Sequence, residues 1–162
     1  MSSFRLLVVA VIATSVAACG FKLRSDPVVP PEMARTYIAT DDRYSPFYRS
    51  FREQLESAGA EVVTSPVDAT AEFSILADDT GQRVLSVSAR NVPTEFEVYY
   101  TINYAVRNAE RTLLEPQLQT LTRDYTYDET RVLGKNREEE LMREAIVDDL
   151  VRLVLFQLSS IQ

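Results

Sequence analysis

The 162-residue chain has no histidine, a single cysteine and only four glycines. Without histidine and with one thiol, the sequence lacks the usual general base, the usual transition-metal ligands and a Cys–His nucleophile pair. Four glycines are too few for a loop that cradles phosphate groups. One cysteine cannot form an intramolecular disulfide, so the hydrophobic core must hold the fold. These absences favour a binding or scaffolding protein that uses neither a metal nor a cofactor.

Carboxylate chemistry is the remaining route to an enzyme. The sequence contains three adjacent pairs of aspartates, Asp41-Asp42, Asp78-Asp79 and Asp148-Asp149. Neighbouring residues do not generally face one another in a helix or a strand. We interpret the first two pairs as turn residues and the third as part of a solvated helix face. A small carboxylate enzyme is therefore the least favoured class, and we assign no catalytic residue.

Acidic residues outnumber basic ones by 24 to 17, which gives a formal net charge of −7. A negative charge of this size keeps a protein soluble and opposes general binding to nucleic acid. The length is that of one ordinary domain.

The amino terminus has the pattern of a secretory signal peptide. Arg5 precedes an apolar run from Leu6 to Val16, which is too short for a transmembrane helix. The segment Val16-Ala17-Ala18-Cys19 then resembles a bacterial lipobox, in which the cysteine is acylated and becomes the new amino terminus. Proteins of this class that stay in the inner membrane commonly carry aspartate after the cysteine, whereas this chain has Gly20. We therefore expect a lipid anchor at Cys19 in the outer membrane; an incidental thiol behind an ordinary signal is the alternative.

The chain divides into three predicted segments. Residues 1–18 form the lipoprotein signal peptide, and residues 19–34 form a lipidated, proline-containing tether. Residues 35–162 form a single α+β domain. No internal repeat or second linker interrupts this domain.

The first half of the domain predicts a strand, a helix and a hairpin. Thr36 to Thr40 is a short strand candidate. Ser45 and Pro46 are typical of a helix start, and Phe47, Phe51 and Leu55 then share one helical face before Gly59 ends the helix. Glu72–Ala77 and Arg83–Ala89 are predicted as two strands joined by a turn at residues 78–81.

The second half predicts two strands and a long helix. From Glu95 to Arg107, apolar and polar residues alternate, which indicates an antiparallel strand with one packed face. A turn at residues 108–111 leads to a strand from Gln117 to Tyr127. Asn136 is predicted to cap the last helix, which has an inward stripe at Met142, Ile146, Leu150, Leu153 and Val154. After Leu150 the helix becomes apolar on more than one side, through Val151, Leu155, Phe156 and Leu158, as is typical of a helix buried on most sides. The expected fold is α+β, with two helices packed on a mostly antiparallel sheet of about four strands.

The segment Cys19-Gly20-Phe21-Lys22-Leu23-Arg24, followed by prolines and Met33, resembles the opening of the lipopolysaccharide-assembly lipoprotein family, LptE. The likeness continues through the Ser45–Gly59 helix and the Arg90-Asn91 step. It returns at Gly134-Lys135-Asn136, which opens the last helix. It therefore covers nearly the whole chain after the signal.

The resemblance implies an outer-membrane lipoprotein that plugs the lumen of the LptD β-barrel from the periplasmic side and assists its assembly. The pair inserts lipopolysaccharide into the outer leaflet, and the plug itself binds lipopolysaccharide. Arg90 and Lys135 match basic residues of the family and are the expected lipopolysaccharide contacts, with weaker support for Arg123. The alternative is an accessory lipoprotein of another envelope assembly without affinity for lipopolysaccharide.

The aromatic residues of the long strand divide between the core and a partner surface. Phe96, Val98, Tyr100 and Ile102 are expected in the core. Tyr99, on the opposite face, and Tyr125 or Tyr127 are the expected contacts with the barrel, because tyrosine combines a large apolar area with a polar tip.

Overall fold

The computed structural model describes residues 28–126 and 135–161, and for residues 135–138 it describes the backbone alone. The predicted signal peptide, Cys19 and Tyr127 lie outside the described residues. No helix in the described part of the chain is both long and apolar enough to cross a membrane. The elements, in chain order, are η1 (Pro31–Met33), β1 (Arg35–Ala39), α2 (Pro46–Ser57), β2 (Glu61–Val63), η2 (Pro66–Asp68), β3 (Ala71–Val87), β4 (Pro93–Arg107), β5 (Thr112–Thr126) and α3 (Lys135–Leu158).

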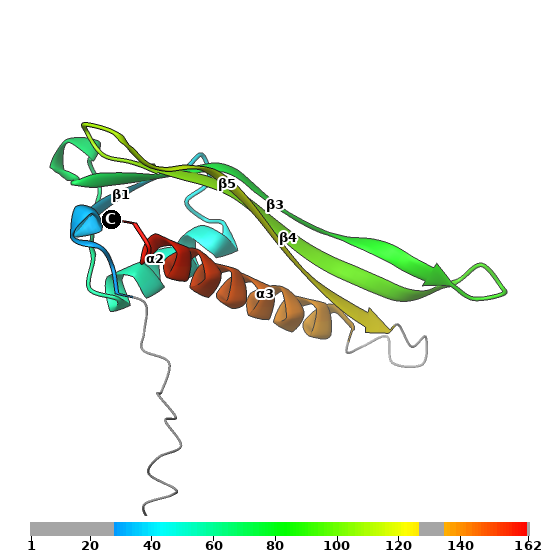
Figure 1. Cartoon of the computed structure of the whole chain (residues 1–162). Helices are drawn as coiled ribbons and strands as arrows, with labels where there is room; N and C mark the ends of the chain where they lie inside the picture. The colour runs from blue at the N-terminus through cyan, green and yellow to red at the C-terminus, as the bar shows by residue number, and fades with distance from the viewer. Residues whose placement is uncertain (1–27, 127–134, 162) are drawn as a thin grey trace, which may run out of the picture.

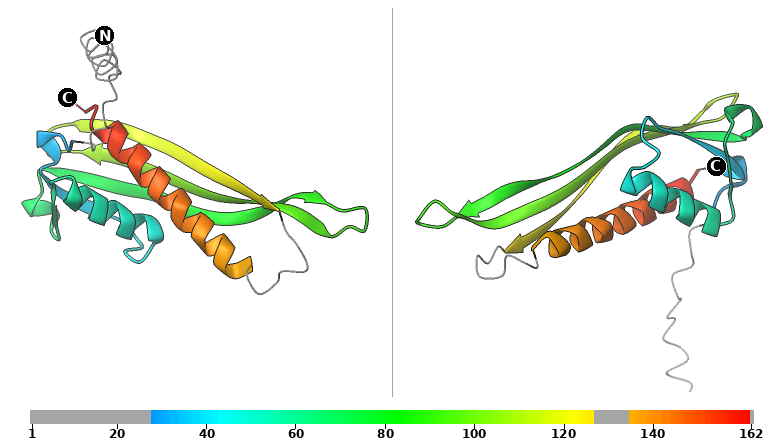
Figure 2. Two further views of the ribbon diagram at one scale, coloured as in Figure 1. Left: turned by 90° about the horizontal axis from the view of Figure 1, so that it is seen from below. Right: turned by 180° about the vertical axis from the view of Figure 1, so that it is seen from behind.

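Two layers make up the fold, a mixed five-stranded sheet and a pair of helices that cover one of its faces (Figure 1). The strand order is β2-β1-β3-β4-β5. β1 pairs in parallel with β2 and β3, whereas β3, β4 and β5 form an antiparallel meander. Both helices lie on the same side of the sheet when it is seen from below (Figure 2). The predicted α+β class is confirmed, and the strand that the sequence did not reveal is the three-residue β2.

The helix α2 begins and ends where the sequence predicts. The Ser45 hydroxyl accepts a hydrogen bond from the Tyr48 amide at 3.0 Å, and Pro46 occupies the first turn. Gly59 follows the helix with a φ of +99°, a left-handed conformation that glycine adopts without strain. These two ends set the length of α2.

Aromatic rings link the helix layer to the sheet. Phe47, Phe51 and Leu55 are completely buried on one face of α2. The Phe51 ring lies 4.2 Å from that of Phe73 on β3, which lies 5.2 Å from that of Tyr104 on β4. Burial of large side chains of this kind is worth roughly 1.5–3 kcal/mol each, so this chain of rings accounts for much of the cohesion between the layers.

The packing of α3 differs from the prediction at two apolar positions. Ile146, Leu150 and Val154 are buried, and Met142 is partly buried against the core. Leu153 is 41% exposed, and Phe156, which was also expected to be covered, is 64% exposed. The reason is the two-layer architecture, in which the outer side of α3 has no further layer upon it. The helix also starts at Lys135, so that Asn136 lies inside its first turn rather than at the cap.

The predicted turn at residues 78–81 is wrong, because β3 continues through it as one strand of 17 residues. Asp78, Asp79, Thr80 and Gly81 pair with successive residues of β4, from Ile102 to Tyr99. The local turn signal is overridden because pairing with β4 satisfies the backbone of the whole segment.

Gly81 has a specific steric reason to be glycine. It pairs with Tyr99 on β4, and the Tyr99 hydroxyl lies 2.6 Å from the place where a Cβ on residue 81 would be. The tyrosine ring thus lies over the glycine backbone on the face of the sheet that the helices leave open. In the sequence Gly81 indicates a turn, but in the structure it is a strand residue over which an aromatic ring packs.

We expect Gly81→Ala to destabilise the protein by about 1 kcal/mol, because the Tyr99 ring must move to admit a methyl group. In a Tyr99→Ala background, the same substitution is expected to be neutral or slightly stabilising, since alanine restricts the unfolded chain. Urea unfolding of the four proteins measures the coupling between the two sites. An equal cost in both backgrounds would show that the ring is not what excludes a side chain at residue 81.

Candidate functional site

Arg90 lies at the tip of the hairpin that joins β3 to β4. The turn is closed by hydrogen bonds from the Ser88 amide to the Val92 carbonyl and from the Asn91 amide to the Ser88 carbonyl, both 2.8 Å. Asn91 has a φ of +60°, which asparagine tolerates better than most residues. This tight turn presents Arg90 to solvent at the far end of the sheet.

Arg90 differs from many arginines of this protein in its charge environment. Arg83 pairs with Glu97 at 2.5 Å, Arg107 with Glu72 at 2.9 Å, and Arg143 with Glu139 at 2.7 Å. Among the side chains that the structure describes, those of residues 28–126 and 139–161, by contrast, no acidic group forms an ion pair with Arg90. Its charge is therefore available to an anionic ligand.

Lys135 is the first residue of α3, and its side chain lies outside the description. Both views in Figure 2 place the start of α3 and the β3–β4 hairpin at the same end of the molecule, away from α2. The fold thus brings the two predicted ligand residues to one end. Whether they bind lipopolysaccharide stays a prediction.

Arg123, the weaker candidate, is engaged within the protein. Its guanidinium lies 2.5 Å from a carboxylate oxygen of Asp149 on α3, and Arg152 pairs with the other oxygen of the same carboxylate. Burial by itself would raise the pKa of Asp149, but the hydrogen bonds from Arg123 and Arg152 outweigh it and lower that pKa. Arg123 therefore ties β5 to α3.

The tyrosines expected at a partner surface divide differently in the structure. Tyr99 is partly exposed on the open face of the sheet. Tyr125 is only 7% exposed, because its ring stacks on Phe96 at 5.5 Å and its hydroxyl donates to the Gln82 side chain at 3.1 Å. The expectation that Tyr125 is an exposed contact is therefore wrong. Tyr125 lies on the helix-covered face of the sheet, as the alternation along β5 indicates. The preference of tyrosine for interfaces led to the wrong prediction.

The expected core of β4 is confirmed at Val98, Tyr100 and Ile102, which are completely buried, while Phe96 is partly buried beside them. The Tyr100 hydroxyl donates to Asp78 at 2.6 Å and accepts from the Phe47 amide at 3.3 Å. Burial, reinforced by Asp78, raises the pKa of Tyr100 well above its ordinary value. This polar link therefore holds the start of α2 to the sheet with a neutral phenol.

The face of the sheet opposite the helices is largely polar. Thr101 and Thr120 share a hydrogen bond of 2.9 Å across β4 and β5. The Arg83–Glu97 and Arg107–Glu72 pairs belong to the same face, as the strand register shows. Leu118, at 66% exposure, is a large apolar residue on this face. Such a surface suits a wet, polar surrounding.

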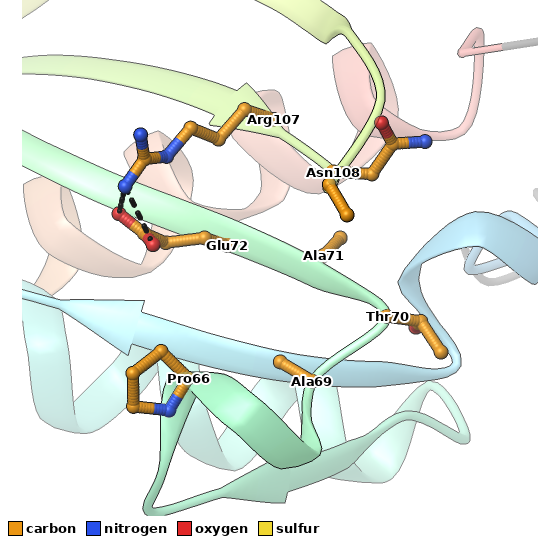
Figure 3. Close-up of a pocket in the computed structure, with 8 residues that line it drawn as sticks. Pro66, Ala69, Thr70, Ala71, Glu72, Arg107 and Asn108 are labelled. Carbon is orange, nitrogen blue, oxygen red and sulfur yellow. Dashed lines mark hydrogen bonds and ion pairs between the residues drawn. The ribbon is translucent and has the colours of Figure 1, made fainter.

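A shallow pocket of about 270 Å³ lies at the other end of the sheet (Figure 3). It is lined by Pro66, Ala69, Thr70, Ala71, Glu72, Arg107, Asn108 and Ala109. Its one cation, Arg107, points to Glu72, and both carboxylate oxygens accept from it at 2.9 Å. Because the charges cancel within the pocket wall, this pocket offers little to an anion.

The carboxylate pairs show no arrangement for chemistry. Asp42 accepts a hydrogen bond from the Tyr44 amide at 2.7 Å in the loop before α2, Asp78 binds Tyr100, and Asp149 is held by two arginines. No cluster of three potential metal ligands occurs in the part of the chain that the structure describes.

The sequence analysis missed the apolar side chains beside Arg90. Val84, Leu85 and Val87 are large aliphatic residues that the hairpin leaves about half exposed. A signal was present in the sequence, since residues 84–94 contain no aspartate or glutamate although the chain is acidic overall. The incorrect prediction of a turn at residues 78–81 hid this signal, because that prediction placed residues 83–89 in a short separate strand.

Comparison with known proteins gives consistent matches. The family model described as "LptE: Lipopolysaccharide-assembly" matches residues 33–158. The LPS-assembly lipoprotein LptE of Yersinia enterocolitica is 26% identical over 94% of this chain and 73% of its own length. The protein of the same name from Photorhabdus laumondii is 24% identical over 96% of this chain and 84% of its own.

Solved structures match as well. An uncharacterized lipoprotein B from Nitrosomonas europaea, with 28% identity, superposes with a TM-score of 0.71 over 87% of this chain and 91% of its own. The rare lipoprotein B from Shewanella oneidensis, with 23% identity, gives a TM-score of 0.68 over 78% of this chain and 94% of its own, which bears on the fold alone.

We expect Asp149→Asn to lower the stability at pH 7 by roughly 0.5–1 kcal/mol, the range of ion pairs near a surface. The folded-state pKa of Asp149 lies below its unfolded value. Its contribution is therefore full above the unfolded pKa of about 4 and disappears as the pH falls through the folded pKa. Thermal unfolding at pH 7 and at low pH, both at low salt, measures this convergence of variant and wild type.

Asp148→Asn is the matched control. Asp148 accepts a hydrogen bond from Ser50 at 3.0 Å and has no ion pair in the described chain, so its loss is expected to cost less at pH 7. If Asp149→Asn destabilised the protein equally at both pH values, the carboxylate would act through packing rather than charge.

Proposed function

This chain belongs to the LptE family of lipopolysaccharide-assembly lipoproteins, and from this premise we propose that it plugs the LptD β-barrel, binds lipopolysaccharide and helps insert it into the outer leaflet. The observation that carries the proposal is the family match over residues 33–158, which spans every strand and both α-helices in full. A role in lipopolysaccharide assembly follows from the family itself. The barrel partner and the direct binding are the proposed part.

The open face of the sheet supports the plug role. A barrel lumen is polar, and a plug within it does not need an apolar outer surface. The threonine bridge between β4 and β5 and the paired charges on the same face fit this surrounding. Tyr99, partly exposed on this face, supplies a large side chain for contact with the barrel wall.

The end of the molecule that carries Arg90 supports ligand binding. Lipopolysaccharide is anionic, and the net charge of the whole chain opposes it. Local charge decides such contacts, because the Debye length is about 8 Å at physiological salt. Arg90 has no ion pair among the described side chains and lies at the same end of the molecule as Lys135. A phosphate group can therefore contact a cation at this end.

The anchor is proposed at Cys19, with residues 1–18 removed and residues 19–34 as the tether to the outer membrane. Several acyl chains on one cysteine hold a protein far more firmly than a single chain does. The domain itself then lies on the periplasmic side, partly within the barrel lumen.

The main test of the proposal is affinity purification of the tagged full chain from detergent-solubilised outer membranes. We expect a large β-barrel protein to copurify in stoichiometric amount, because a plug is buried in its barrel. The mass of the amino-terminal peptide from the same sample reports acylation of Cys19. A different stable partner, with no large barrel, would favour an accessory role in another envelope assembly.

The ligand residues are tested by charge reversal. We expect Arg90→Glu combined with Lys135→Glu to weaken lipopolysaccharide binding at least about tenfold, since each removes a charge-assisted contact and adds repulsion. Copurification of the barrel should persist. The measurement is equilibrium binding of labelled lipopolysaccharide to the purified protein.

Arg49→Glu provides the matched control, because Arg49 is an exposed arginine on α2, at the other end of the molecule. Its reversal is expected to leave the affinity close to that of the wild type. A double variant that binds as well as the wild type would remove Arg90 and Lys135 from the site.

A further inference from the structure

The β3–β4 hairpin extends beyond the rest of the fold. β5 ends at Thr126, which pairs with Glu95, so the first residues of β4 after the turn, Pro93 and Thr94, have β3 as their sole described strand neighbour. Figure 1 shows this two-stranded ribbon continuing past the end of β5 and the start of α3. Both faces of the ribbon tip are thus without a covering layer of described residues.

The tip is apolar where a ribbon in water is normally polar. Val84 is 48% exposed, Leu85 46% and Val87 52%. Val84 pairs with Phe96 on the helix-covered side of β4, whereas Val87 pairs with Pro93 on the opposite side, and two register shifts interrupt the ladder between them. The hairpin therefore carries three large aliphatic groups within four consecutive positions, spread over both faces of the ribbon.

The same irregularities argue against an added strand as the occupant. A bulged, twisted edge is one of the devices by which proteins prevent strand-to-strand association. A partner that recognised this edge through backbone hydrogen bonds would need a regular ladder, which residues 84–87 do not provide. The occupant must instead be recognised through side chains.

The charge of the tip also indicates what kind of ligand it binds. Residues 84–94 contain Arg90 and no acidic residue, and the next residue, Glu95, lies opposite Ser86. Arg90 has no ion-pair partner among the side chains that the structure describes. Aliphatic groups and one available cation on a single turn are complementary to a molecule that carries both acyl chains and an anionic group. A bare anion would not use the aliphatic groups, and a sugar chain would use neither them nor the charge.

We propose that the hairpin tip, residues 84–94, binds the acyl region of lipopolysaccharide through Val84, Leu85 and Val87, while Arg90 binds a phosphate of the same molecule. This inference rests on the proposed function and deepens it by naming the acylated, phosphorylated part as what the hairpin recognises. The three aliphatic side chains make the hairpin bind the acylated form more tightly than the deacylated form. Arg90 contributes to the binding of any phosphorylated form.

The test compares intact lipopolysaccharide with the same material after complete deacylation, which keeps the sugars and phosphates. The wild-type protein is expected to bind the intact form at least about tenfold more tightly, given the apolar area available on three side chains. A variant with Val84→Thr, Leu85→Thr and Val87→Thr should lose most of this preference and keep its affinity for the deacylated form. Arg90→Glu should weaken the binding of both forms.

Leu118→Thr is the matched control, since it removes an exposed aliphatic group from β5 rather than from the hairpin. Threonine favours strands, and thermal unfolding verifies that each variant is folded. If the triple variant does not fold, Leu85→Thr alone is expected to reduce the preference about threefold.

The outcomes distinguish a failure of the hairpin assignment from a failure of the proposed function. A wild-type protein that fails to bind either form overturns the proposed ligand and the hairpin assignment with it. A triple variant that retains the full preference, or that weakens both forms equally, overturns the hairpin assignment and leaves the proposed function intact.

Two further results would identify another occupant and so overturn the assignment. One is binding to phosphatidylglycerol-containing vesicles as tight as binding to lipopolysaccharide, which would indicate a general membrane surface. The other is concentration-dependent self-association that the triple variant abolishes, which would indicate a second copy of the chain.

Discussion

The continuous pairing of β4 with two neighbours is the constraint on which the rest of the structure depends. Over its 15 residues β4 pairs with β3 on one side and, from Glu95 onward, with β5 on the other. Its alternation sends Val98, Tyr100, Ile102, Tyr104 and Val106 into the core, and both helices pack on the face so formed. Because strand register is fixed by this buried face, the positions of Arg90 at one end and Asn108 at the other follow from it.

Polar links also join the two layers. Tyr100 reaches the start of α2 through its hydroxyl, and the Tyr104 hydroxyl donates to Gln157 on α3 at 2.7 Å. Burial raises the pKa of Tyr104 to about 12, so that this phenol stays neutral across the physiological range. The helices are thereby oriented on the sheet by hydrogen bonds as well as by apolar packing.

The sequence was informative where local signals and tertiary structure agree. The Ser45-Pro46 start, the Gly59 end and the alternation of β4 each have one local physical cause, and each was predicted correctly. The turn at residues 78–81 failed because pairing with β4 outweighs local preference, and β2 escaped notice because a three-residue strand has no measurable period. Leu153 and Phe156 were misassigned since hydrophobicity cannot tell how many layers a fold has. Arg90 was found through family resemblance, whereas the aliphatic tip beside it became visible only once β3 was seen to be one strand.

The interior position of β1 in the sheet has a mechanical consequence. Under the proposed anchoring at Cys19, any pull on the tether reaches the domain through Met33, which is completely buried, and then β1. β1 lies between β2 and β3 and pairs in parallel with both, so tension along its axis loads its hydrogen bonds together, in shear. An edge strand pulled sideways would release its bonds one after another. The first strand after the anchor is therefore placed where the domain resists extraction best.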